Sequence, residues 1–131
     1  MLRSDMVEIL DDRPCLKVQW DWGDAYLWLK NHGGGSVCLE HEYPNAKWAK
    51  KLDKDLLHWW DILAAYEHEH QTNGEFADLT NFDWQAFNAK GIALAKRLKQ
   101  NLGDEAHVEY ASSVLANWAH KTLWSSEEET V

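Results

Sequence analysis

Hydrophobic and polar residues alternate along the first third of the chain, and a period of two is typical of a β-strand with one buried face. The alternation is clearest over residues 15–22, and it is followed by a nearly continuous apolar run at 25–30 and a second alternation at 37–43. Glycine-rich turns separate the three segments. The pattern therefore predicts an antiparallel β-meander, to which a short strand over residues 7–9 can be added.

After Asn45, a good N-cap residue, the apolar residues instead recur every three or four positions, as on one face of an α-helix. This helix is expected to end among Glu67–His70. A second helix is expected after a polar loop, because Thr80 and Asp83 resemble a capping box and Gly103 provides a stop. The predicted buried stripes are Trp48, Leu52, Leu56, Trp59, Trp60 and Leu63 on the first helix, and Trp84, Phe87, Gly91, Leu94, Leu98 and Leu102 on the second.

The last quarter of the chain predicts one more strand and one more helix. Val108 and Tyr110 alternate with polar residues and are expected to return to the sheet. Ser112 or Ser113 is expected to cap a last helix. The apolar residues assigned to that helix are Val114, Leu115, Trp118 and Leu123.

Together these elements predict an α+β fold, in which an antiparallel meander of roughly three to five strands carries two to three helices on one face. A chain of 131 residues fits a single domain, spanning 1–131. Residues 1–5 and 125–131 are expected to be frayed.

The net charge limits the classes of partner that the protein can bind. The net charge is −9, from 22 acidic and 13 basic residues. Binding to phosphate needs clustered Lys and Arg, so nucleic acid and anionic membranes are excluded as partners and a basic protein is favoured. Eight of the bases form two helical groups, which are expected to be solvated helix faces although they could hold a small anion: Lys47, Lys50, Lys51 and Lys54, then Lys90, Lys96, Arg97 and Lys99.

No apolar stretch is long enough for a signal peptide or a membrane span, which predicts a cytoplasmic protein. Cys15 and Cys38 are then expected to be reduced thiols, although their strands could be neighbours and a disulfide between them is geometrically possible. The expected oligomeric state is a monomer or a weak dimer.

Several motifs suggest chemistry but lack a complete set of residues. The HGGGS run at 32–36 has no GxSxG nucleophile elbow and no following GK[ST], so a flexible hairpin loop is favoured. Glu67 and His70 could share a metal, but HExxH spacing is missing, and no metal or other cofactor is predicted. Cys15, beside Lys17 on one strand face, gives only a weak signal for a reactive thiol.

Acidic and aromatic residues form the most suggestive pattern. Glu40 and Glu42 fall on one face of the expected third strand, where one could act as a general acid or both could simply be solvated. Carboxylates interleaved with aromatic rings suit a basic protein, because the rings supply apolar burial and the acids bind arginine. The predicted partner-binding residues are Asp21, Asp24, Trp28, Glu40, Glu42, Glu67 and Glu69.

Two segments carry a resemblance to a known class of proteins: WAKKLDKDLLHWWDILA at 48–64 and FNAKGIALAKRLKQNLGDEAHVEY at 87–110. Their helix-and-strand pattern over residues 48–110 resembles small bacterial immunity proteins encoded beside polymorphic toxins, including those of contact-dependent growth inhibition systems. The resemblance implies a cytosolic antidote that binds a toxin domain, often a basic nuclease, and blocks it. It carries over no interface residue.

The leading hypothesis is therefore a non-enzymatic immunity protein that occludes a basic toxin in a stoichiometric complex. The alternative is a small enzyme or ligand-binding domain with a tryptophan-lined pocket, in which Glu40 and Glu42 would be the acid and base candidates. A third possibility is a structural subunit that oligomerises through an exposed tryptophan patch, since the chain has nine tryptophans.

Overall fold

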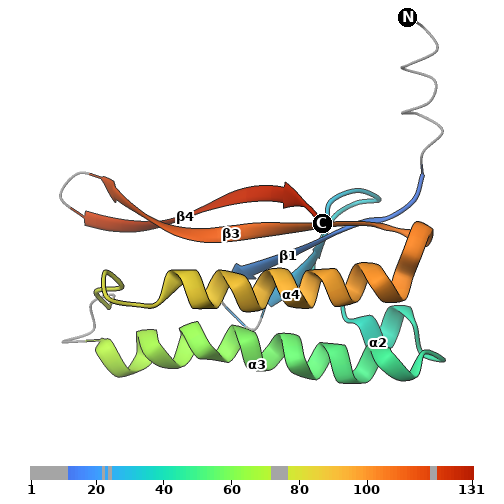
Figure 1. Ribbon diagram of the computed structural model, residues 1–131, viewed down its shortest axis with the longest axis horizontal. Coiled ribbons are helices and arrows are strands. Elements are labelled where there is room, and N and C mark those ends of the chain that lie inside the picture. The colour runs from blue at the N-terminus through green and yellow to red at the C-terminus, as the bar shows by residue number, and fades with distance from the viewer. Residues whose placement is uncertain (1–11, 22, 24, 72–76, 119–120) are drawn as a thin grey trace, which may run out of the picture.

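The computed structural model describes residues 12–21, 23, 25–71, 77–118 and 121–131, with the backbone alone for 113–118 and 121–128. The elements in chain order are β1 (Cys15–Asp21), β2 (Ala25–Leu29), α2 (Leu39–Glu42), α3 (Lys47–His70), α4 (Trp84–Leu102), the 3-10 helix η1 (Gly103–Glu105), β3 (His107–Trp118) and β4 (Lys121–Thr130). The α+β class predicted from the sequence is confirmed (Figure 1). The expected strand at residues 7–9 lies outside the described residues.

The strands form one mixed sheet in the order β2-β1-β3-β4. β1 pairs antiparallel with β2, and β3 pairs antiparallel with β4, whereas β1 and β3 run parallel. A meander would have made every pair antiparallel. Here the long helices α3 and α4 run in opposite directions and return the chain to the end of the sheet where β1 begins, so β3 enters beside β1. The backbone N–H of His107 donates to the carbonyl of Pro14 at 2.8 Å, which fixes that entry.

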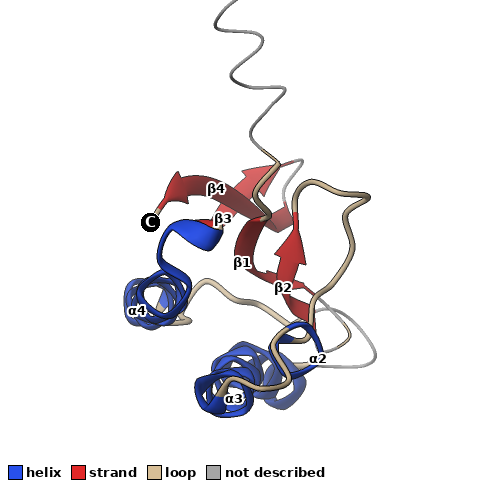
Figure 2. Ribbon diagram, turned by 90° about the vertical axis from the view of Figure 1, so that its right-hand side faces the viewer, coloured by secondary structure: helices blue, strands red, loops and turns tan. Residues whose placement is uncertain are grey.

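Both long helices lie on the same side of the sheet, as predicted (Figures 1 and 2). The alternation in β1 is confirmed, because Leu16, Val18 and Trp20 are buried and the residues between them are half-buried. The helices contribute the predicted stripes to the same core. Its fully buried side chains include Trp59, Phe87, Leu52, Leu56, Leu63 and Leu98.

A pair of tryptophans joins β1 to the middle of α3. The rings of Trp20 and Trp60 stack with centroids 5.7 Å apart. The indole N–H of Trp20 donates to the carbonyl of Trp60 at 2.8 Å, and the indole N–H of Trp60 donates to the carbonyl of Asp21 at 2.5 Å. The polar edge of each ring thus binds backbone, and much of the tryptophan content is used in the fold.

Tyr110 of β3 is fully buried against α4, and its hydroxyl donates to Oδ1 of Asn88 at 2.7 Å. Gly91 faces its ring so closely that an added Cβ would lie 2.6 Å from Cζ of Tyr110. Burial, with a smaller contribution from the Glu129 carboxylate, raises the pKa of Tyr110 well above the ordinary value of 10.0. Helix and sheet therefore approach here at the distance that only glycine permits.

The prediction of a strand at 37–43 is wrong, because Leu39–Glu42 forms the short helix α2. Leu39 and Tyr43, which the alternation assigned to one strand face, are also four residues apart and share one face of a helix turn. Asp53 of α3 favours the helix over the strand. Its carboxylate accepts from the N–H of Leu39 at 3.0 Å and from the N–H of Glu40 at 2.8 Å. These are N-terminal amides of the short helix, which have no other backbone partner within it.

The prediction of a helix after Ser112 or Ser113 is also wrong. β3 runs continuously to Trp118 and pairs with β4 in a register that extends from Glu109 opposite Thr130 to Trp118 opposite Lys121. The three- and four-residue spacing of Val114, Leu115 and Trp118 was too short to distinguish the two structures. Residues 125–130, expected to be frayed, belong to β4.

The helix ends differ in part from the predicted caps. Ala46, and not Asn45, is the N-cap of α3, and it makes no side-chain capping bond. Asp83 is itself the N-cap of α4, where its carboxylate accepts from the N–H of Ala86 at 3.0 Å. The Thr80 hydroxyl instead donates to Asp78. Gly103 ends α4 with a positive φ of 57°, as predicted.

Candidate functional site

The predicted partner-binding residues on the strands lie at different places. Asp21 is half-buried at the end of β1, and Asp24 lies outside the described residues. Trp28 of β2 is half-buried opposite Lys17 in the register with β1, and its indole N–H donates to the carbonyl of Gln19 at 3.1 Å. Since Lys17 alternates with buried Leu16 and Val18, Trp28 lies on the sheet face that points away from the helices.

The four glutamates of the predicted set form two pairs that are far apart. Glu40 and Glu42 are exposed on α2, near the start of α3. Glu67 and Glu69 lie in the last turn of α3, about 30 Å away by the rise of its 24 residues. Glu67 is only 6% exposed and accepts from the Gln71 amide at 2.8 Å, whereas Glu69 is exposed. The described members of the set therefore do not share one surface.

The sheet face away from the helices lacks two of the acids that the sequence assigned to it. Glu40 and Glu42 do not belong to it, because α2 replaces the expected strand. Its central acid, Glu109, is paired with Lys30 at 2.6 Å between Nζ and Oε2. The Cys15 thiol also approaches Oε2 of Glu109, at 3.6 Å. Cys15 and Cys38 do not form a disulfide with each other.

The outward side of α3 carries the largest run of exposed charge on the described helices. We call it the outer face of α3, and its exposed residues are Lys47, Lys50, Lys51, Lys54, Leu57, His58, Asp61, Ala65, His68 and Glu69. The first four form a lysine half and the last four an acidic half. Leu57, between them, is 43% exposed and is the exposed large hydrophobic residue of the described chain.

The charges at the start of α3 oppose its helix dipole. The partial positive charge of a helix N-terminus favours acidic residues, but the first turn of α3 contains none and begins with Lys47. The opposite, partially negative end carries Glu67 and Glu69, but also the basic residues His68 and His70. The mismatch at the start costs about 0.3–1 kcal/mol at an exposed helix terminus. The arrangement therefore does not stabilise the helix.

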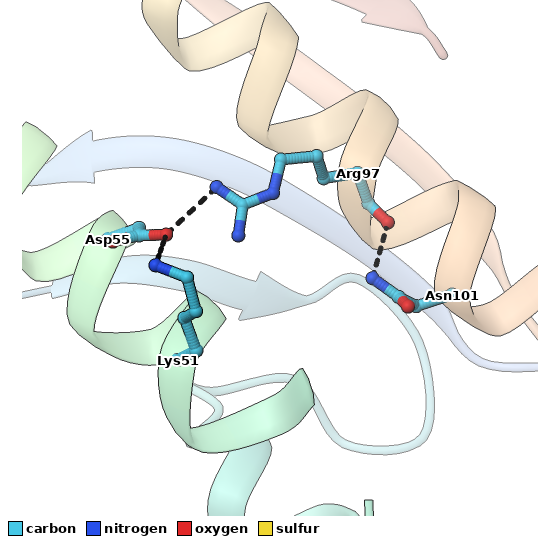
Figure 3. Close-up of polar contacts among 4 residues, drawn as sticks. All are labelled: Lys51, Asp55, Arg97 and Asn101. Atoms are coloured by element: carbon cyan, nitrogen blue, oxygen red, sulfur yellow. Dashed lines mark hydrogen bonds and ion pairs between the residues drawn. The ribbon is translucent and has the colours of Figure 1, made fainter. Parts of the chain in front are cut away.

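A charged triad joins the lysine half to α4 (Figure 3). Asp55 binds Arg97 at 2.9 Å between Oδ2 and Nη1, and Lys51 approaches the same oxygen at 3.4 Å. The hydrogen bond from Arg97, followed by that from Lys51, lowers the pKa of Asp55 below its ordinary value. Asn101 donates to the carbonyl of Arg97 at 2.9 Å. Arg97, from the second basic group of the sequence, is thus placed beside the first.

Asp53 has a structural role that the sequence reasoning missed. It is 8% exposed, and besides the two α2 amides it contacts the Cys38 thiol at 3.4 Å between Sγ and Oδ2. A signal was present, because Asp53 lies between the buried residues Leu52 and Leu56 at the margin of the apolar stripe. A carboxylate in such a place requires hydrogen-bond partners. It holds α2, with Glu40 and Glu42, against the start of α3.

The residues weighed for catalysis or metal binding are dispersed. No group of three or more His, Cys, Asp or Glu side chains is placed to hold a metal ion within the described part of the chain. His70 stacks on Tyr66 and contacts its carbonyl at 2.8 Å. A pocket of about 250 Å³ lies beside β2, and its described lining, which includes Tyr26, Val37 and Cys38, contains no tryptophan.

The described helices include none long and apolar enough to cross a membrane. The chain belongs to the Serratia CdiI immunity protein-like family, whose model matches residues 14–113. Comparisons with curated proteins and with solved structures gave no match. The predicted immunity-protein resemblance is thereby confirmed, and the match extends it from 48–110 to include β1, β2 and α2. Membership implies a toxin as protein partner.

Proposed function

We propose that this protein neutralises a cognate toxin in the cytoplasm by forming a stoichiometric complex, without catalysing a reaction. The family match carries this proposal, because it covers the elements from β1 to α4 and the first part of β3. The described surface is compatible with it. Its accessible chemistry consists of charged helix residues and half-buried aromatic rings, which suit the rim and the anchors of a protein interface.

The more specific proposal is that the toxin is a basic nuclease. A net charge of −9 would accelerate the encounter with a basic protein and slow the approach of nucleic acid. Among the predicted contact residues, Glu40, Glu42 and Glu69 are exposed and can contribute to this attraction, while Trp28 offers a half-buried ring. Because the acids are distributed over several surfaces, they would steer the toxin more than define its docked position.

The test is a titration of the toxin domain encoded beside this chain's gene. Residual cleavage of DNA and of RNA is measured while this protein is added at increasing molar ratios. A stoichiometric inhibitor abolishes cleavage at a ratio of about one, and light scattering after size exclusion gives the mass of a one-to-one complex. A toxin from an unrelated system is the control. Protection at a small fraction of this ratio would instead indicate an enzyme, and absence of both binding and protection would refute the immunity proposal.

A further inference from the structure

The lysine half of α3 is a positive surface on a negative protein. Lys47, Lys50 and Lys54 are exposed, and none of the three has an ion pair within the described part of the chain. Their spacing of three and four residues places them along one side of the helix. Lys51 and Arg97 share the carboxylate of Asp55, so the triad retains a net positive charge. The lysine half is therefore net positive, and the exposed acids that lie near it are Glu40 and Glu42 of α2.

Apart from the contact of Lys51 with Asp55, the fold gains no ion pair from the lysine half within the described part of the chain. An acidic first turn would stabilise α3, yet its first turn has no acid and its N-cap, Ala46, makes no side-chain bond. The exposed Leu57 adjoins the lysine half by its three-residue spacing from Lys54. Residues that break local rules without a compensating gain in the fold are expected at functional sites.

A protein fits the lysine half better than nucleic acid does. Nucleic acid would be repelled by the net charge of −9, and four lysines on two helix turns provide few phosphate contacts. Leu57 adds an apolar side chain at the edge of the charged group, as in an interface where a buried anchor is surrounded by polar residues. The helix behind it is held rigidly by the buried residues Leu52, Leu56 and Trp59.

We infer that the lysine half of α3, with Leu57, docks on an acidic patch of the cognate toxin. The inference rests on the proposed immunity function and adds the location and chemistry of the contact. The phosphate-binding groove of a nuclease is lined by basic residues, which would repel these lysines. The patch therefore lies outside that groove, and the toxin is held at a site separate from its phosphate contacts.

The test measures the affinity of full-chain variants for an inactivated toxin domain by calorimetry. One variant reverses three charges on α3, and a second reverses two charges on α4. Lys47→Glu/Lys50→Glu/Lys54→Glu is expected to weaken binding by roughly tenfold or more, with a reduced dependence on salt. Lys90→Glu/Lys96→Glu, on exposed positions of α4, is the control and is expected to change the affinity by less than about threefold. Leu57→Ala is expected to weaken binding by about tenfold without a change in salt dependence.

Thermal unfolding separates a binding role from a structural one. Acids near the start of α3 favour the helix, so the triple variant should unfold at the same or a higher temperature while its affinity falls. If wild-type protein binds the toxin and the triple variant binds equally well or more tightly, the inference is wrong and the immunity function stands. If wild-type protein does not bind the toxin, the proposed function fails. Binding of wild-type protein to a DNA or RNA duplex, lost in the triple variant, would assign the lysines to nucleic acid and overturn the inference.

Discussion

The inner and outer faces of α3 follow opposite rules, although they belong to one helix. On the inner face, Leu52, Leu56 and Leu63 are almost completely buried and every contact supports the fold. On the outer face, lysines occupy the end of the helix that favours acids, and the first turn contains no acid. The inner face could be recognised from periodicity alone, whereas the outer face is informative because it departs from what helix stability requires.

Two carboxylates in the first half of α3, Asp53 and Asp55, show the same difference within a single turn. Asp53 points toward α2, is 8% exposed and accepts from two backbone amides. Asp55 lies on the other side, partly exposed, and pairs with long, flexible side chains. Burial makes the first carboxylate an integral part of the fold, because its hydrogen bonds replace those of water. Exposure makes the second a minor contributor.

The largest effect is expected where the helix layer meets the sheet most closely. Gly91→Ala places a methyl group inside the ring of Tyr110, which can move only by disturbing β3 or its bond to Asn88. We expect the free energy of unfolding to fall by about 3 kcal/mol, measured by urea denaturation. Ala93→Gly, on the exposed face of the same helix, is the matched reverse change and should cost only about 1 kcal/mol. Equal losses in the two variants would show that the close approach is not tight.

An intermediate effect is expected from the inward carboxylate. Asp53→Ala leaves the N–H groups of Leu39 and Glu40 without their acceptor and should cost about 2 kcal/mol. Hydrogen exchange should show faster exchange of these two amides than in the wild type. Asp53→Asn keeps an acceptor oxygen and should lose less. If exchange at α2 is unchanged in Asp53→Ala, the carboxylate does not hold α2.

The sequence predicts the helical layer and its buried stripes because the two helical periodicities run for more than ten residues, and it predicts β1 from the alternation over residues 15–22. It misplaces α2, since Leu39 and Tyr43 fit both periods and the deciding contact comes from Asp53, fourteen residues beyond Leu39. It misses β4 for a related reason. The residues after Ser113 fit a short helix as well as a strand, and the pairing of β3 with β4 determines that they form strands.

For the candidate site, the sequence identifies residue types but not their neighbours. The lysines of α3 and Arg97 are separate groups along the chain, and only the antiparallel packing of α3 and α4 brings them together. The predicted acids are dispersed for the same reason. Once the expected strand at 37–43 becomes a helix, Glu40 and Glu42 leave the sheet and join the start of α3. An alternation of seven residues could not reveal this.

The smallest effect is expected from the outward carboxylate, and it carries a pH dependence of known sign. The pKa of Asp55 is lowered by Arg97 and Lys51, so its ionised form stabilises the fold above the unfolded-state value of 3.8, and this contribution is lost as the pH falls through the lower folded-state pKa. Asp55→Asn should therefore cost less than about 1 kcal/mol at neutral pH, and the difference from wild type should shrink in strong acid or at about 1 M salt. Asp61→Asn, an equal charge change at an exposed position of the same helix, is the control for the loss of one negative charge. A loss as large as that of Asp53→Ala would mean that the outer face also supports the fold, and the contrast between the two faces of α3 would not hold.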